Sequence, residues 1–142
     1  MKTIALSALI VALTAPVPAL GTAAEPSRLS LAFEASAPTG AVMVTLFDSE
    51  AAYAGGAPVR QARIDLAKGE RTAVFGGLQA GNYAVKAFHD VNGDGRMNAN
   101  PFGVPIEPVA FSNNAPVNMG APGWDKVRFE VRGATAQTIK FR

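Results

Sequence analysis

The chain has 142 residues, of which 49% are hydrophobic and 17% charged, with a formal net charge of +2 and no cysteine. Lysines and arginines scattered over so nearly neutral a chain form no basic patch, which excludes nucleic acid and anionic lipid as primary partners. The lack of cysteine excludes disulfides, a thiol nucleophile, a zinc–thiolate site and a lipid-modified cysteine.

The first 24 residues have the three zones of a secretory signal peptide. Lys2 gives a positive amino-terminal region, and residues 4–13 form an apolar stretch that is too short to span a membrane. Two prolines then interrupt any helix, and residues 22–24 are small, as a cleavage site requires. We therefore expect cleavage after Ala24 and export to the periplasm or the extracellular space. One mature domain, residues 25–142, would remain, with a net charge of +1 because Lys2 is lost.

Several segments of the mature chain show the alternation of polar and apolar residues that is typical of half-buried strands. The expected strands are residues 28–35, 41–47, 59–67, 71–75, 82–89, 124–131 and 135–141. Residues 50–58 have no period, and we expect a loop there with at most a short helical turn. About seven short strands joined by glycine and proline turns predict an all-β fold, an antiparallel β-sandwich of the immunoglobulin-like kind with one long loop.

The clearest strand ends at His89, the single histidine of the chain. Because side chains alternate along a strand, His89 shares a face with Tyr83 and points away from Asp90. We predict a structural histidine, hydrogen-bonded beneath the long loop that follows. A hydrolase that uses His89 with Asp90 or Glu107 is the alternative, although Ser112 lacks the G-x-S-x-G context of a nucleophile.

Residues 90–123 form the long loop, which has no period and is rich in asparagine, glycine and proline. Loops of this length are commonly functional or disordered, and Phe102 and Phe111 argue against disorder. Trp124 follows the loop, and we predict that it plugs one end of the sandwich core. In the alternative, Trp124 and the loop form a carbohydrate- or peptide-binding site.

The start of this loop carries oxygen-bearing side chains at alternate positions. Asp90, Asn92 and Asp94 occupy the first, third and fifth positions of an EF-hand-like calcium loop, and Gly95 occupies the sixth, where that loop turns sharply. Hard cations such as Ca²⁺ take six to eight oxygen ligands. The expected ligands of a Ca²⁺ ion are Asp90, Asn92, Asp94, the carbonyl group of Arg96, Asn98 and Glu107.

The match to an EF-hand ends at the twelfth position, where Pro101 replaces the bidentate glutamate and no helical pattern flanks the loop. Glu107, Asn113 or water would have to complete the coordination shell. Asn-Gly and Asp-Gly pairs are also good turn formers, so a plain turn without an ion is the alternative.

Three blocks of the sequence are similar to one bacterial family. The chain resembles the uncharacterised family catalogued as domain of unknown function 2141, from Leu29 to Phe141, although Ala110 replaces a glycine of the family pattern. The resemblance implies an exported β-sandwich related to transthyretin-like or carboxypeptidase-regulatory-like domains, and it implies no catalytic residues. The first block is residues 77–85, and the third consists of residues 102–107 and 111–115. The second block matches at six positions, namely Phe88, His89, Asp90, Asn92, Gly95 and Asn98.

These observations predict an exported, non-enzymatic β-sandwich protein. Its polar loop would bind Ca²⁺ and thereby order a binding surface for a cell-surface or extracellular ligand.

Overall fold

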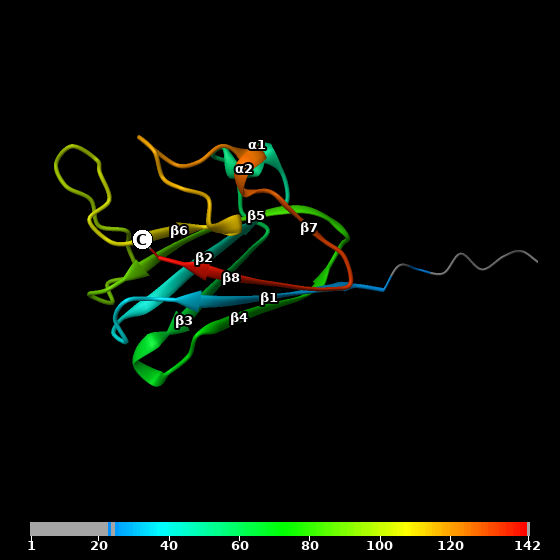
Figure 1. Cartoon of the computed structure of the whole chain (residues 1–142), viewed down its shortest axis with the longest axis horizontal. Coiled ribbons are helices and arrows are strands. Elements are labelled where there is room, and N and C mark those ends of the chain that lie inside the picture. The colour runs from blue at the N-terminus through cyan, green and yellow to red at the C-terminus, as the bar shows by residue number, and fades with distance from the viewer. Residues whose placement is uncertain (1–22, 24, 142) are drawn as a thin grey trace, which may run out of the picture.

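The structure, a computed structural model, describes residue 23 and residues 25–141 of the chain. The expected signal peptide and its cleavage site lie outside the described residues, apart from Ala23. The described chain folds into two β-sheets that pack face to face (Figure 1), which confirms the predicted all-β sandwich. The described residues form eight strands, where the sequence predicted about seven.

The first sheet has three strands in the order β4-β1-β8, with β1 at Ser27–Glu34, β4 at Thr72–Leu78 and β8 at Ala134–Lys140. Strand β1 is antiparallel to β4 but parallel to β8. The predicted antiparallel arrangement is therefore incomplete. A parallel pair needs a long crossover, and here the whole second sheet lies between β1 and β8 along the chain.

The second sheet is antiparallel throughout and has the order β3-β2-β5-β6. Strand β7 pairs with the first residues of β5, on the side where β6 pairs with the later ones. The strands of this sheet are β2 at Ala41–Phe47, β3 at Arg60–Asp65, β5 at Gly81–Asp90, β6 at Val109–Phe111 and β7 at Phe129–Val131.

Two short α-helices, α1 at Glu50–Tyr53 and α2 at Trp124–Val127, lie together at one end of the second sheet (Figure 1). Helix α1 is the expected helical turn, and the Ser49 hydroxyl caps it by accepting a hydrogen bond from the Ala52 N–H. Short 3₁₀ helices occur at Leu66–Lys68 and Ser112–Asn114.

The prediction of a strand over residues 124–131 is wrong in its first half, which is helix α2. Residues three apart share one face of a helix but lie on opposite faces of a strand. The helical turn therefore places both Trp124 and Val127 against the same apolar cluster.

The predicted loop 90–123 is also interrupted, by strand β6 and the 3₁₀ helix that follows it. Within β6, Phe111 pairs with Lys86 of β5 and Val109 pairs with Phe88. Three residues are too few to show a period of two, so the sequence pattern gave no sign of this strand.

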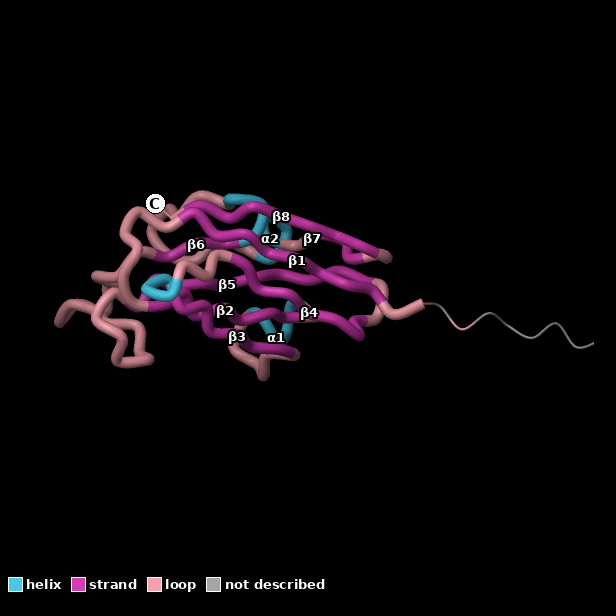
Figure 2. Tube along the Cα trace, turned by 90° about the horizontal axis from the view of Figure 1, so that it is seen from below, coloured by secondary structure: helices cyan, strands magenta, loops and turns pink. Residues whose placement is uncertain are grey.

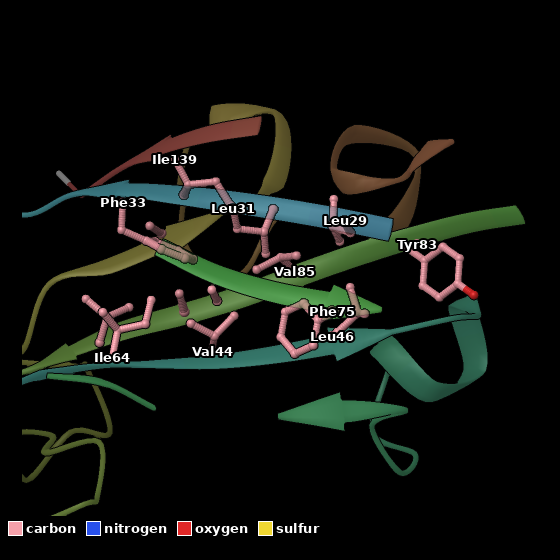
Figure 3. Packing of buried hydrophobic residues seen from close by; sticks show 14 of the residues in the cluster. Leu29, Leu31, Phe33, Val44, Leu46, Ile64, Phe75, Tyr83, Val85 and Ile139 are labelled. Carbon is pink, nitrogen blue, oxygen red and sulfur yellow. The ribbon is translucent and has the colours of Figure 1, made fainter. Parts of the chain in front are cut away.

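The main core fills the space between the sheets (Figure 3). Leu29, Leu31 and Phe33 of β1 face Val44 and Leu46 of β2 there, and all five are buried. These are the inward positions that strict alternation predicted.

A second, smaller cluster lies on the outer face of the second sheet, under α1 and α2. It contains Phe47, Tyr53, Ala84, Phe111 and Val127. This cluster covers one part of the outer face. Loop residues line the neighbouring part of that face.

Candidate functional site

Asp90 ends strand β5 and organises the polar loop, residues 90–98. The side chain is fully buried. Its Oδ1 atom accepts hydrogen bonds from the N–H groups of Gly93, at 2.8 Å, and Asp94, at 3.1 Å, and its Oδ2 atom accepts one from Gly95 at 2.8 Å. Hydrogen bonds to an ionised carboxylate are stronger than neutral ones. The buried carboxylate therefore fixes the first turn of the loop.

Three further side chains of the polar loop converge above this turn. The amide nitrogen of Asn98 lies 3.1 Å from Asp94 Oδ2, and the amide nitrogen of Asn92 lies 3.0 Å from Asn98 Oδ1. Arg96 takes part through its N–H, which donates to Asp94 Oδ1 at 2.8 Å. This N–H and the Asn98 amide lower the pKa of Asp94, so its carboxylate is ionised at neutral pH.

Glu107 lies against the polar loop. It was one of the residues predicted to approach the loop if the loop held an ion. Its Oε1 atom accepts from the Val91 N–H and its Oε2 atom from the Asn98 N–H, both at 3.0 Å. The side chain is buried and ties the two ends of the loop together. Asn113, the other residue considered for this role, lies elsewhere, with its side-chain amide donating to the carbonyl groups of Lys126 and Arg128.

The polar loop offers side-chain oxygens as possible cation ligands but few carboxylates. Within the described residues, no group of three or more His, Cys, Asp or Glu side chains is placed to hold a metal ion. Backbone donors already occupy both oxygens of Asp90 and of Glu107. Asn92 and Asp94 are exposed and Asn98 is half-buried, and their side-chain oxygens accept hydrogen bonds within the loop. An ion would have to replace these bonds, with carbonyl groups and water completing its shell.

His89 is buried in the structure, as predicted for a structural histidine. Its Nε2 atom lies 2.7 Å from the carbonyl oxygen of Thr39, and because a carbonyl only accepts, Nε2 carries the hydrogen. The ring packs against Phe141 at 6.0 Å. The partner of the ring is thus the turn before β2, while the backbone N–H of His89 donates to the carbonyl group of Pro108, which lies within the long loop just before β6.

The block Ser112–Asn114 joins the two sheets, a role that the sequence did not reveal. The Asn114 side chain bonds the backbone of Thr138 and Lys140 in β8, and Asn113 bonds Gln137 of the same strand. Both asparagines have left-handed backbone angles, which asparagine tolerates better than most residues. Two consecutive asparagines, Asn113 and Asn114, are the feature of the sequence that could have indicated this left-handed turn.

Ser112 is buried, and its hydroxyl accepts from the Val85 N–H at 2.9 Å and donates to the Val127 carbonyl at 2.6 Å. We expect Ser112→Ala to lower the free energy of unfolding by about 2–4 kcal/mol, because it leaves two buried backbone groups without a partner. Urea denaturation measures the change, and Ser36→Ala, at an exposed serine, is the control. Equal losses in the two variants would contradict this role for Ser112.

An apolar groove of about 750 Å³ lies on the outer face of the second sheet, beside the polar loop. Thr45, Lys86, Phe88, Val109 and Phe111 form its floor from strands β2, β5 and β6. Its walls come from residues 97–105, in the loop before β6, and residues 117–121, in the loop before α2. Figure 2 shows loops gathered at one end of the two sheets. The groove could not be predicted from the sequence, because the residues that form its walls show no periodic pattern.

The loops around the groove expose large apolar side chains. Phe102 is 91% exposed and Ile106 66%, while Met119 is fully exposed and Met97 about half exposed. Contiguous exposed apolar surface marks sites of interaction with a ligand or partner. Hydrogen bonds within the polar loop and a short β-bridge between Ala99 and Pro105 support the segment that carries Met97, Phe102 and Ile106.

Lys86 is the charged residue of the groove. Its Nζ atom donates to the Tyr53 carbonyl at 2.7 Å and lies 4.0 Å from the centre of the Tyr53 ring and 5.1 Å from that of Phe47. Desolvation by burial lowers the pKa of this ammonium group. In the described part of the chain, it forms no ion pair with a carboxylate.

Trp124 is half-buried, and its ring lies 6.0 Å from that of Tyr53 in the second cluster. Trp124 does pack against an apolar cluster, as predicted. This cluster lies on the outer face of the second sheet, however, and not at the end of the main core. This packing leaves less of the indole face free for stacking on a sugar.

The fold and its polar loop define an all-β sandwich protein with a structured insertion between β5 and β6. The model of the family described as "Uncharacterized protein conserved in bacteria (DUF2141)" matches residues 34–140, and the chain belongs to this family. Among curated proteins and among solved structures, none matches the chain significantly. In the part of the chain that the structure describes, no helix has the length and apolar character needed to cross a membrane.

Proposed function

We propose that this protein is an exported, non-enzymatic binding protein whose polar loop takes up Ca²⁺ and holds the neighbouring apolar surface in a binding-competent form. One observation carries the proposal. Asp90 and Glu107 tie down the base of the segment 91–108, while its apolar side chains, among them Phe102 and Ile106, are held out in solvent. Such surface exposed on a rigid support is typical of recognition sites.

The surroundings of the two residues with catalytic potential support a non-enzymatic role. His89 and Ser112 are both fully buried, and each bonds backbone groups of the fold. A hydrolase needs its base and nucleophile within reach of a substrate. The two carboxylates considered as partners of His89, those of Asp90 and Glu107, are occupied by backbone donors.

Calcium binding is supported by the convergence of Asn92, Asp94 and Asn98 and by the ionised state of Asp94. Bound Ca²⁺ would replace the hydrogen bonds among these side chains with coordination bonds. Asp90 and Glu107 hold the base of this loop, and the ion would fix the side chains above it. The neighbouring wall of the groove would then be held more firmly.

We expect millimolar Ca²⁺ to raise the melting temperature of residues 25–142 relative to chelator. An ion at a hundred times its dissociation constant adds about 2.7 kcal/mol, which corresponds to roughly ten degrees for a domain of this size. Differential scanning calorimetry measures the shift, with Mg²⁺ as a second ion.

Asp94→Ala is the matched variant, because the exposed side chain bonds within the loop and not to the core. It should melt close to the unchanged protein in chelator and lose the response to Ca²⁺. A response of equal size in both proteins would place the ion elsewhere, and no response in either would leave the polar loop as a structural turn.

A further inference from the structure

The apolar groove combines a large apolar surface with one cationic group. Its floor and walls are mainly aliphatic and aromatic side chains, and Lys86 is the charged residue among them. Small-molecule sites typically have volumes of about 300–1,000 Å³, apolar walls and a few placed polar groups, and this groove of about 750 Å³ matches that description.

Among the described residues, no carboxylate forms an ion pair with Lys86. An ammonium group has three hydrogen-bond donors, and the structure shows one of them used, by the Tyr53 carbonyl. The rings of Phe47 and Tyr53 offer the ammonium group their negative faces but carry no net charge. A partly desolvated cation in an apolar groove favours a ligand that brings a negative charge.

We propose that the groove binds a single-chain amphiphile, an apolar chain with one carboxylate head, and that Lys86 Nζ binds the head. The inference rests on the proposed binding role and names the class of ligand. One ammonium group balances one negative charge, which favours a carboxylate over a dianionic phosphate. Phosphate sites commonly use the bidentate geometry of arginine, and no arginine lines this groove in the described chain.

The register of the second sheet sets the direction of the ligand. Lys86 pairs with Thr45 on one side and Phe111 on the other, next to the cluster under α1. Phe88, two residues on, shares its face and pairs with Val109 towards the polar loop. The head group therefore lies near α1, and the chain runs over Phe88.

The walls of the groove include Met97 and Val104, from the loop before β6, and Met119, from the loop before α2. Methionine side chains are unbranched and adapt to irregular apolar shapes. These walls accept apolar chains of somewhat different length, so the head group, and not the chain, sets the selectivity.

Isothermal titration calorimetry with dodecanoate, dodecanol and dodecyltrimethylammonium, each kept below its micelle concentration, tests the proposal. We expect dodecanoate to bind most tightly to the unchanged protein. Hydrogen bonds to charged groups contribute about 1.5–3 kcal/mol, so Lys86→Met should weaken dodecanoate binding roughly ten- to a hundredfold. Dodecanol binding should stay the same, and Lys86→Arg should keep most of the preference for the carboxylate. Melting curves confirm that both variants are folded.

A second pair of variants tests the groove without touching Lys86. Met119 lines the groove and is fully exposed, whereas Val74 is exposed on β4, in the other sheet and away from the groove. Aspartate suits the left-handed backbone of Met119 (φ 55°), so Met119→Asp should fold normally and repel the carboxylate. Val74→Asp is the control, and its affinity for dodecanoate should match that of the unchanged protein.

The outcomes separate this inference from the calcium proposal. Dodecanoate binding that depends on Lys86 supports the inference even if the polar loop ignores Ca²⁺. Equal affinity for the three amphiphiles, or an affinity unchanged in Lys86→Met, overturns it. Light scattering that shows a dimer whose interface Met119→Asp breaks would also overturn it, because a second copy would then cover the groove.

Discussion

Asp90→Ala is expected to lower the free energy of unfolding by about 3 kcal/mol, even in chelator. The buried carboxylate accepts hydrogen bonds from the N–H groups of Gly93, Asp94 and Gly95. Each such charge-assisted bond contributes about 1.5–3 kcal/mol, and some of the loss is recovered when water reaches the freed donors. Urea denaturation monitored by circular dichroism measures the change.

Two variants separate the parts of this effect. Asp90→Asn keeps the size of the side chain but replaces one accepting oxygen with an NH₂ group. This NH₂ group would face a backbone N–H and could not accept its hydrogen bond. We therefore expect Asp90→Asn to lower the free energy of unfolding by about half as much as Asp90→Ala. Asp94→Ala should leave stability in chelator nearly unchanged, because its side chain is exposed and bonds only within the loop among the described residues. If Asp90→Ala unfolds like the unchanged protein, the carboxylate does not hold the polar loop.

The contrast between these two aspartates shows what local sequence can predict about the site. The alternation of Asp90, Asn92 and Asp94 with Gly95 is a local pattern, and the structure does bring these residues into one loop. Burial, however, depends on the surrounding fold, and the pattern could not show that Asp90 is buried while Asp94 is exposed. Glu107 was predicted as one of several ways to close the loop, since its approach depends on the path of the intervening residues.

The same distinction applies to the fold. Strand β2 was predicted to the residue, because its alternation is strict from Ala41 to Phe47. The parallel pairing of β1 with β8 joins residues about a hundred positions apart and leaves no local mark. The groove was missed for a related reason, since its floor consists of outward-facing residues that alternation assigns to solvent, such as Lys86 and Phe88.

Gly40→Ala is expected to lower the free energy of unfolding by about 2–4 kcal/mol and to weaken any response to Ca²⁺. Gly40 has a φ of +68°, a left-handed conformation that costs other residues roughly 1–2 kcal/mol. A Cβ atom there would overlap the carbonyl oxygen of Asp90 and lie 2.9 Å from that of Val91. Relieving such overpacking typically costs about 1–3 kcal/mol more.

Gly69→Ala is the matched control for this second prediction. Gly69 also has a positive φ, +83°, but a Cβ atom there would meet nothing within 4 Å. Its substitution should therefore cost only the conformational part, about 1–2 kcal/mol. The difference between the two variants, measured by urea denaturation, isolates the contact of Gly40 with the end of β5. Equal losses would mean that the turn before β2 yields without moving Asp90. A larger loss in Gly40→Ala, with a smaller shift in melting temperature on adding Ca²⁺, would show that this turn helps to set the position of the polar loop.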